Sequence, residues 1–369
     1  MQGKSGHRST PERRKIALAL QGGGSHGAFT WGVLDRLLED PTIEIVGVTG
    51  TSAGAMNSVV LADGVLGGGP EGGRQRLRAF WEAIGKMPGF GTPLWPLSGE
   101  MQSHVHLEQT PAYLAWDLVS RNLSPSQLNP MNFNPLREPL TELVDFERIR
   151  AQKELTVMVC ATNARTSWRR VFHNKDISVD AVLASACLPQ MFPPVMIDGQ
   201  PYWDGGFTGN PAMMGLFPFL PKSDLIIVRI DPIIRVDVPQ SVREIHDRVT
   251  EVSFNSTFWM EAGAIGMLLK MKEAGWLKGE RFERFNFHAI QASEHLEKIP
   301  ASTKINNSPQ FLEFLFGLGR TTAEEWLAKN GEAIGRRSTI DLTKLLPQDI
   351  VAQMALRTRE YEDASPAGD

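Results

Sequence analysis

Two apolar segments near the N-terminus are each followed at once by a cluster of small residues. Lys15–Leu20 leads into Gln21-Gly22-Gly23-Gly24, and Ile43–Val48 leads into Gly50-Thr51-Ser52-Ala53-Gly54. Between them, Ala28–Leu38 carries its large apolar residues at helical spacing. This strand, helix, strand order predicts an α/β sandwich whose first two strands are parallel.

The chain alternates such signals up to about residue 340. A glycine-rich break at Gly64–Gly73 separates two expected helices, and Asp198-Gly199 is expected to be the turn of a hairpin over Pro193–Trp203. The other expected strands are Leu155–Ala161, Trp168–Phe172, Leu225–Ile230 and a segment near Phe285–Ile290; the expected helices are about Gly54–Leu61, Arg74–Ile84, Val179–Ser185, Val242–Met271 and Phe311–Lys329. We therefore expect a polar tail over 1–14, one α/β domain over 15–340 and a partly disordered extension over 341–369.

Residues 87–131 differ in character from the segments around them. Six prolines (Pro88, Pro93, Pro96, Pro111, Pro125 and Pro130) alternate with large apolar side chains there. Long connections in compact domains are usually functional covers or disordered segments, and large apolar residues such as Trp95 and Trp116 disfavour disorder. We expect a cap over the edge of the sheet.

The composition excludes several classes of partner. Of the 369 residues, 42% are hydrophobic and 22% charged, with a net charge of −4, which is typical of a soluble globular protein. Without a long basic run, nucleic acid is not an expected partner. No apolar run approaches the roughly 20 residues of a membrane-spanning helix, and no signal-peptide pattern precedes Lys15. Because Cys160 and Cys187 cannot form a disulfide framework, we expect a cytoplasmic protein with buried, structural cysteines.

Ser52 lies in a G-x-S-x-G sequence between an expected strand and an expected helix. That is the layout of a nucleophile elbow, a sharp turn that exposes a serine hydroxyl at a sheet edge. The flanking Gly50 and Gly54 allow strand and helix backbones to approach closely. A second match, Gly23-Gly24-Ser25-His26-Gly27, lies inside the first glycine cluster. There a serine more naturally caps the following helix, so Ser52 is the favoured nucleophile.

The glycine loop Gly22-Gly23-Gly24 admits two interpretations. Its spacing with Gly27 fits a dinucleotide fingerprint, but that site needs an acidic residue at the tip of the second strand. The second strand ends instead in Val48-Thr49-Gly50, and no P-loop lysine is present. Glycine amides at a helix N-terminus also stabilise the oxyanion that forms when serine attacks an ester. We expect Gly22, Gly23 and Gly24 to form such an oxyanion hole.

A nucleophilic serine needs a base. In an α/β-hydrolase triad the histidine follows the serine and the acid, and His246, His288 and His295 stand far enough along the chain. None lies in a distinctive loop, and the elbow follows the second strand, too early for that fold. Asp204, at the end of an aromatic strand and before Gly205 and Gly206, is the better candidate. Burial would raise its pKa toward neutrality.

The order Gly22-Gly23-Gly24, then Gly50-Thr51-Ser52-Ala53-Gly54, then Asp204-Gly205-Gly206 resembles the patatin-like phospholipases. Pro189-Gln190-Met191-Phe192-Pro193-Pro194 looks like the proline-rich segment that precedes the Asp-Gly motif in that family. The resemblance covers about Lys15 to Pro232. It implies a three-layer α/β/α fold with a central, mostly parallel or mixed sheet, a helical cap insertion and a helical C-terminal region.

The resemblance also implies a chemistry. Ser52 would accept the acyl group, Asp204 would be the base in a Ser-Asp dyad without histidine, and the glycine loop would hold the oxyanion. The substrate would be a phospholipid or another acyl ester, with transient contact to a membrane surface and no metal or other cofactor. Many relatives carry Arg or Lys where this chain has His26, which would make any support of the donor loop dependent on pH.

Three alternatives stay open at this point. The same dyad serves acyl thioesterases and acyltransferases, and a lipid-binding protein can keep the fold without turnover. Nucleotide binding through the glycine loop is the weakest of the three. The sequence does not predict the head group, the acyl-chain length or the oligomeric state.

Overall fold

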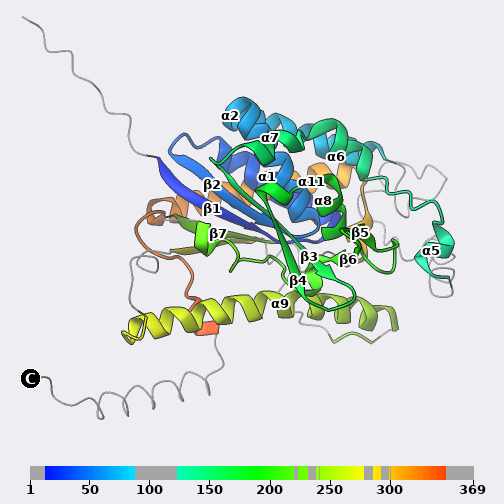
Figure 1. Cartoon of the computed structure of the whole chain (residues 1–369). Coiled ribbons are helices and arrows are strands. Elements are labelled where there is room, and N and C mark those ends of the chain that lie inside the picture. The colour runs from blue at the N-terminus through cyan, green and yellow to red at the C-terminus, as the bar shows by residue number, and fades with distance from the viewer. Residues whose placement is uncertain are drawn as a thin grey trace, which may run out of the picture.

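A mixed eight-stranded sheet runs through the computed structural model, which describes residues 13–87, 123–219, 223–231, 238–240, 242–277, 286–291, 299 and 301–345 (Figure 1). The strand order is β5-β6-β3-β2-β1-β7-β8, and β4 also pairs with β3. The strands are β1 (Arg14–Leu20), β2 (Ile43–Gly50), β3 (Thr156–Asn163), β4 (Arg169–His173), β5 (Val195–Ile197), β6 (Gln200–Asp204), β7 (Asp224–Arg229) and β8 (Phe287–Gln291). Strands β3, β2, β1, β7 and β8 are parallel to one another, whereas β4 and β6 are antiparallel to β3.

Helices cover both faces of the sheet (Figure 1). On one face lie α1 (Gly27–Leu38), α2 (Ala53–Lys86), α6 (Arg137–Leu143), α7 (Phe146–Ala151), α8 (Val179–Ser185) and α11 (Pro309–Asn330). The other face carries the long helix α9 (Val242–Glu273), and the short helix α5 (Pro125–Leu128) lies to one side. The predicted three-layer α/β/α architecture is therefore confirmed.

Strand β1 shows why two helical layers are needed. Alternate side chains of a strand point to opposite faces. Ile16, Leu18 and Leu20 belong to the larger hydrophobic cluster, under α1, α2 and α11. Ala17 and Ala19 belong to a second cluster that includes residues of α9. A strand that is apolar on both faces remains stable only when both faces are covered.

The expected glycine-rich break at Gly64–Gly73 is only a kink. Helix α2 continues from Ala53 to Lys86, and within it the backbone leaves helical geometry only at Gly68 and Gly69. The prediction of two helices separated by ten residues was therefore wrong in extent. Gly64 and Gly72 pack so closely that a Cβ on either would overlap the other's carbonyl oxygen, so the glycines serve close backbone packing as well as the kink.

The remaining predicted elements occur within a few residues of their expected limits. The Asp198-Gly199 hairpin turn is present, with φ of 51° and 71° at the two residues. Most of the expected cap over 87–131, the tail over 1–14 and the extension over 341–369 lies outside the described residues.

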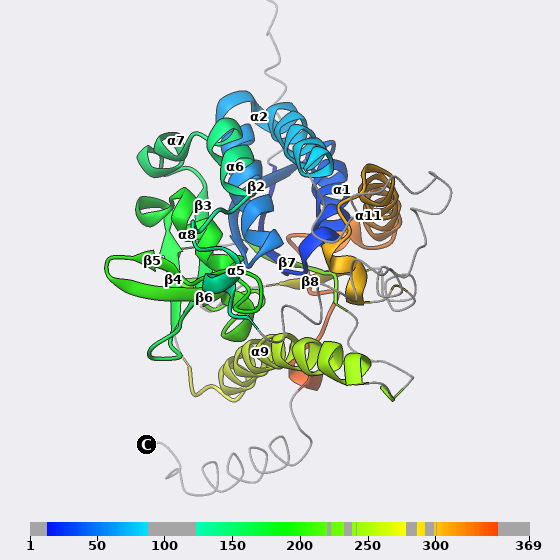
Figure 2. The same ribbon diagram turned by 90° about the vertical axis from the view of Figure 1, so that its right-hand side faces the viewer.

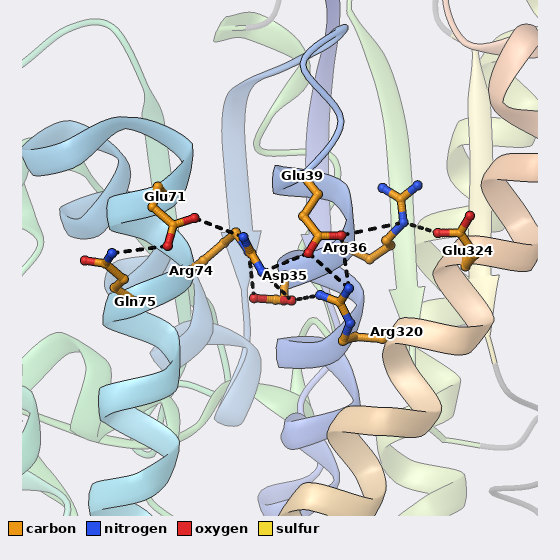
Figure 3. A network of polar contacts seen from close by, with 8 residues as sticks. All are labelled: Asp35, Arg36, Glu39, Glu71, Arg74, Gln75, Arg320 and Glu324. Atoms are coloured by element: carbon orange, nitrogen blue, oxygen red, sulfur yellow. Dashed lines mark hydrogen bonds and ion pairs between the residues drawn. The ribbon is translucent and has the colours of Figure 1, made fainter.

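A network of ion pairs fastens α11 to α1 and α2 (Figure 3). The Asp35 side chain of α1 is almost fully buried and pairs with Arg74 of α2 and Arg320 of α11. Glu39 pairs with the same two arginines, and the network extends to Glu324 through Arg36. Because two cations converge on one buried carboxylate, α11 is held against α1 by charge as well as by apolar packing.

Candidate active site

Ser52 occupies the turn between β2 and α2. Its φ of 55° and ψ of −122° lie outside the regions that a non-glycine residue ordinarily adopts, and such strained residues cluster at functional sites. The Ser52 amide donates to Ser185 Oγ at 2.9 Å, which helps to fix the turn. A Cβ on Gly54 would overlap the Leu20 carbonyl oxygen, and one on Gly50 would overlap the Gly54 carbonyl. The sharp, closely packed turn from strand to helix is therefore present, and its role as a nucleophile elbow stays a prediction.

Asp204 is delivered to the same place by the antiparallel strand β6. It pairs with Ala161 of β3, the neighbour of β2, and its side chain is fully buried. Its Oδ1 accepts the Gly206 amide hydrogen at 2.7 Å. Its Oδ2 completes no hydrogen bond with the described residues, yet the Ser52 hydroxyl lies near enough to favour the ionised carboxylate.

The environment of Asp204 tunes its acidity. Burial raises the pKa of Asp204 from 3.8 to about 7, and the Gly206 amide, the Ser52 hydroxyl and the Lys304 ammonium oppose that rise. Removal from water penalises the charged form of a carboxyl group. A carboxylate whose pKa lies near neutral pH can take up and return a proton under physiological conditions.

The glycine loop reaches the site in a form that differs from the expectation at one position. The Gly22 amide donates to Asn210 Oδ1 at 2.7 Å, so it is not available to a substrate. Neither Gly23 nor Gly24 donates its amide to another of the described residues, and both border the cavity beside Ser52. Gly24 has a φ of +58°, and a Cβ there would overlap the Lys304 carbonyl oxygen. This position therefore requires glycine.

Ser52 and Asp204 open into one apolar cavity of about 190 Å³, called here the Ser52 cavity. Its polar lining consists of Ser25, Ser52, Asp204, Thr250, Lys304 and Asn307, and its apolar lining consists of Ala53, Met56, Phe80, Trp81, Ile84, Met87, Leu136, Ala186, Leu188, Met191, Phe192, Phe254 and Ile305, with Gly23 and Gly24 completing the wall. A few polar groups in an apolar hollow are typical of a site for a hydrocarbon ligand with one reactive group.

Several site residues come from parts of the chain that sequence reasoning did not single out. Asn210, Ser185 and Lys304 carry no motif. The Lys304 ammonium lies 2.6 Å from Asp231 Oδ1, whose side chain is fully buried after β7. The turn that carries Lys304 is tied to the glycine loop by a 2.8 Å hydrogen bond between His26 Nε2 and Thr303 Oγ1. Of these three residues, Asn210 could have been noticed in the sequence, because it directly precedes a proline.

The structure also shows where the alternative candidates for the nucleophile and the base lie. His26 faces Thr303 and is not part of the cavity wall as described. His288 is buried between Asp224 and Thr339, toward the amino-terminal ends of β7 and β8 and hence at the edge opposite Ser52. The His246 side chain and His295 lie outside the described residues. Ser25 lines the cavity but caps no helix end, so the expected capping role was wrong.

Cys160 and Cys187 are free and buried, and burial raises the pKa of each thiol to about 12, as expected of structural cysteines. Among the described residues, no group of three or more His, Cys, Asp or Glu side chains is placed to hold a metal ion. Within the same residues, no helix combines the length and apolar character needed to cross a bilayer.

Residues 18–216 match the family model described as patatin-like phospholipase. The chain belongs to the patatin-like phospholipase family. The matched segment contains the glycine loop, the Ser52 elbow and the Asp204 motif, and it ends before β7. Lys304, α9 and α11 therefore lie outside the part that the family model defines.

Comparison with other proteins adds distant likenesses only. No curated protein matches the chain. VipD from Legionella pneumophila is 16% identical, with a TM-score of 0.33, over 84% of this chain and 67% of its own. ExoU in its complex with SpcU, from the type III secretion system of Pseudomonas aeruginosa, is 15% identical with a TM-score of 0.28, over 96% of this chain and 61% of its own. The family assignment rests on the family model.

Proposed function

We propose that this patatin-like protein is a lipid acyl hydrolase that works through a Ser52–Asp204 dyad. The observation that carries the proposal is the convergence on one apolar cavity of the strained Ser52, a buried Asp204 of near-neutral pKa and two glycine amides that bond to none of the other described residues. A binding protein gains nothing from a strained serine beside a carboxylate of raised pKa, because both features cost stability. Family membership supports the same conclusion.

Acylation is the first half of the reaction. Asp204 takes the proton from Ser52 Oγ as this oxygen attacks the ester carbonyl and forms a C–O bond. The carbonyl oxygen becomes an oxyanion, which the Gly23 and Gly24 amides stabilise. Collapse of this intermediate breaks the ester bond, and the proton on Asp204 passes to the departing alcohol. The acyl group is then an ester of Ser52.

Deacylation reverses the roles. Asp204, ionised again, takes a proton from a water molecule, whose oxygen attacks the acyl-Ser52 carbonyl. The same two amides hold the second oxyanion. When the bond to Ser52 breaks, Asp204 returns the proton to Oγ and the fatty acid leaves. Loss of one oxyanion donor ordinarily lowers the rate by about 10²–10³.

The cavity wall indicates the substrate class. Among the described residues, thirteen side chains of the wall are apolar, enough to surround a hydrocarbon chain and exclude water from the ester. Of the polar lining, the Ser52 hydroxyl and the Lys304 ammonium act on the Asp204 carboxylate, whereas the Asn307 amide bonds to the Ile84 and Met87 carbonyls. We infer that the acyl chain enters the apolar part while the alcohol portion leaves toward Lys304. The expected cap over 87–131 borders this region at Met87, and its contribution to chain-length preference stays a prediction.

The test is release of p-nitrophenol from short and medium acyl esters. Wild type would be compared with Ser52→Ala and Asp204→Asn, and with Ser25→Ala as a matched control on the same cavity wall. Circular dichroism would check the folding of each. We expect Ser52→Ala and Asp204→Asn to lose at least about 10³ in rate and Ser25→Ala to remain active.

Full activity of Ser52→Ala would overturn the dyad, and an inert wild type would favour lipid binding without turnover. A thiol ester and an acceptor alcohol, tested alongside, would detect a thioesterase or acyltransferase.

A further inference from the structure

The middle of α9 has an outer surface without charge. From Val249 to Leu269 the helix contains two ionisable residues, Glu251 and Glu261. Both are 4% exposed, and they pair with Arg248 and Arg169, respectively. The surface of a soluble domain is ordinarily about 25–35% charged residues. A 21-residue helical face of about 30 Å without one exposed ionisable group is therefore unusual.

Apolar side chains make up most of the exposed residues of this outer face. From Val249 to Leu269 they are Val249, Val252, Met260 and Met267, and Ser256 is the exposed polar residue among them. Val242 and Ile245, in the charged turns before Val249, are exposed as well, and the exposed fractions of the six apolar residues run from 43 to 74%. Val242, Ile245, Val249 and Val252 follow one another at intervals of three or four residues, so they form one stripe along the helix. The side chains on the opposite side of α9, such as Phe258 and Ile265, pack into the second hydrophobic cluster. Helix α9 is thus apolar both toward the sheet and toward solvent.

The outer face adjoins the Ser52 cavity. Thr250 and Phe254, which lie between the stripe and the sheet, line that cavity, and a Cβ on Gly206 would touch the Phe254 ring. Met131 and Phe133 are 89% and 69% exposed, and the segment that carries them leads to Leu136 in the cavity wall. Figure 2 looks onto α5, which precedes this segment, with α9 below it. Two segments that contribute to the cavity wall thus also carry exposed apolar side chains.

We propose that the outer face of α9 docks the protein on the surface of a phospholipid bilayer. The helix would lie in the plane of the interface with the Val242–Val252 stripe and Met260 inserted among the acyl chains, as apolar helix faces do to a depth of about 5–10 Å. Charged residues of both signs begin only at the ends of the face, as with Lys270, which pairs with Glu273 at 3.0 Å. A face without exposed charge from Val249 to Leu269, beside a cavity with an apolar wall, complements the acyl region of a lipid surface.

In this orientation, docking on the bilayer would also bring lipid close to the Ser52 cavity. Because α9 is a wall of the Ser52 cavity, a bilayer on its outer face would lie within reach of the cavity and could supply acyl chains without their passing through water. That part of the inference rests on the proposed function. The docking itself depends only on the apolar, uncharged face, so the two can be tested apart.

The experiment is co-sedimentation with vesicles in a Ser52→Ala background, where binding does not depend on hydrolysis. The vesicles would be phosphatidylcholine, with and without phosphatidylserine. Val249→Glu combined with Val252→Glu places two charges on the stripe at positions already 59% and 50% exposed. The matched control is Trp168→Glu combined with Phe314→Glu, at positions 77% and 50% exposed on other elements. Circular dichroism and thermal melting would show that all variants fold.

We expect the Ser52→Ala protein and the control to bind vesicles alike and the α9 double variant to bind at least tenfold more weakly. Equal binding by the α9 variant would overturn the proposal. The proposal would also be overturned if the protein bound no vesicles but formed a dimer in light scattering that the α9 variant did not form. A second copy of the chain would then cover the face. Vesicle binding that persists while wild type proves inert on every ester would retain the docking surface and reject the proposed hydrolase.

Discussion

Asn210 Oδ1 accepts the hydrogen of the Gly22 amide at 2.7 Å, although the two residues are 188 positions apart. The Asn210 amide in turn donates to Thr257 Oγ1 of α9 at 3.0 Å. Asn210 thus links the glycine loop through its side chain and α9 through its backbone amide, and it does so from the segment that follows Asp204. We expect this residue to help hold the glycine loop in position relative to Asp204.

Replacing Asn210 by alanine should lower kcat with little change in KM. The Gly22 amide would be left buried without an acceptor, which costs about 1–3 kcal/mol, and the donor loop would shift relative to Ser52. A misplacement of about 1 Å can cost 10²-fold in rate, so we expect a loss of tenfold or more. Steady-state kinetics on a p-nitrophenyl ester would measure it. An unchanged kcat in a folded variant would show that the loop holds its position without Asn210.

The rate should rise with pH through a titration near neutrality. Asp204 must be ionised to accept the proton of Ser52, and its pKa is raised to about 7. Below that pH the protonated acid cannot act as a base, so kcat/KM should fall by about tenfold for each pH unit. A profile of kcat/KM between pH 5 and 9 would show this limb. A rate that stays flat down to pH 5 would indicate that Asp204 is ionised at much lower pH than its burial implies.

Lys304→Gln should move that acidic limb to higher pH. The Lys304 ammonium lowers the pKa of Asp204, although less than the Gly206 amide and the Ser52 hydroxyl do. Removal of the cation therefore raises the pKa, and a higher pH is needed for the same activity. Lys304→Arg, which keeps the charge beside Asp231, is the control and should leave the limb in place. If both variants shift it equally, side-chain shape rather than charge is responsible.

Asp204→Asn should melt at a higher temperature than wild type at pH 8. A carboxyl whose folded pKa of about 7 exceeds its ordinary value of 3.8 binds its proton more tightly in the folded state. Stability is therefore lost as pH rises from about 4 to 7, and the full cost, at most about 4 kcal/mol, is present above pH 7. The uncharged amide avoids this cost. Thermal melts at pH 8 and pH 5 should show a gap that closes at the lower pH, and a lower melting temperature at pH 8 would contradict the assignment.

The local part of the fold could be predicted from the sequence because it depends on neighbouring residues. Period-two and helical apolar patterns located the strands and helices within a few residues. The Ser52 turn was recognisable because its backbone strain requires small residues directly beside it, at Gly50 and Gly54. Asp198-Gly199 identified its hairpin for a similar reason, since both residues adopt positive φ. The glycine-rich stretch of α2 was misjudged because most of its glycines serve helix-to-helix packing, which no local pattern reveals.

Contacts between distant segments were decided only by the tertiary structure. The sequence by itself determined that a serine, an aspartate and a glycine loop would lie at strand ends of one α/β sheet. It did not determine that Asn210 would accept the Gly22 amide hydrogen, so that Gly23 and Gly24 remain as the proposed donors. Nor did it determine that Lys304 would reach the cavity wall. Nor did it show which face of α9 would remain exposed. Burial and charge pairing depend on which surfaces meet in three dimensions, so the near-neutral pKa of Asp204 arises only when the folded chain excludes water around it.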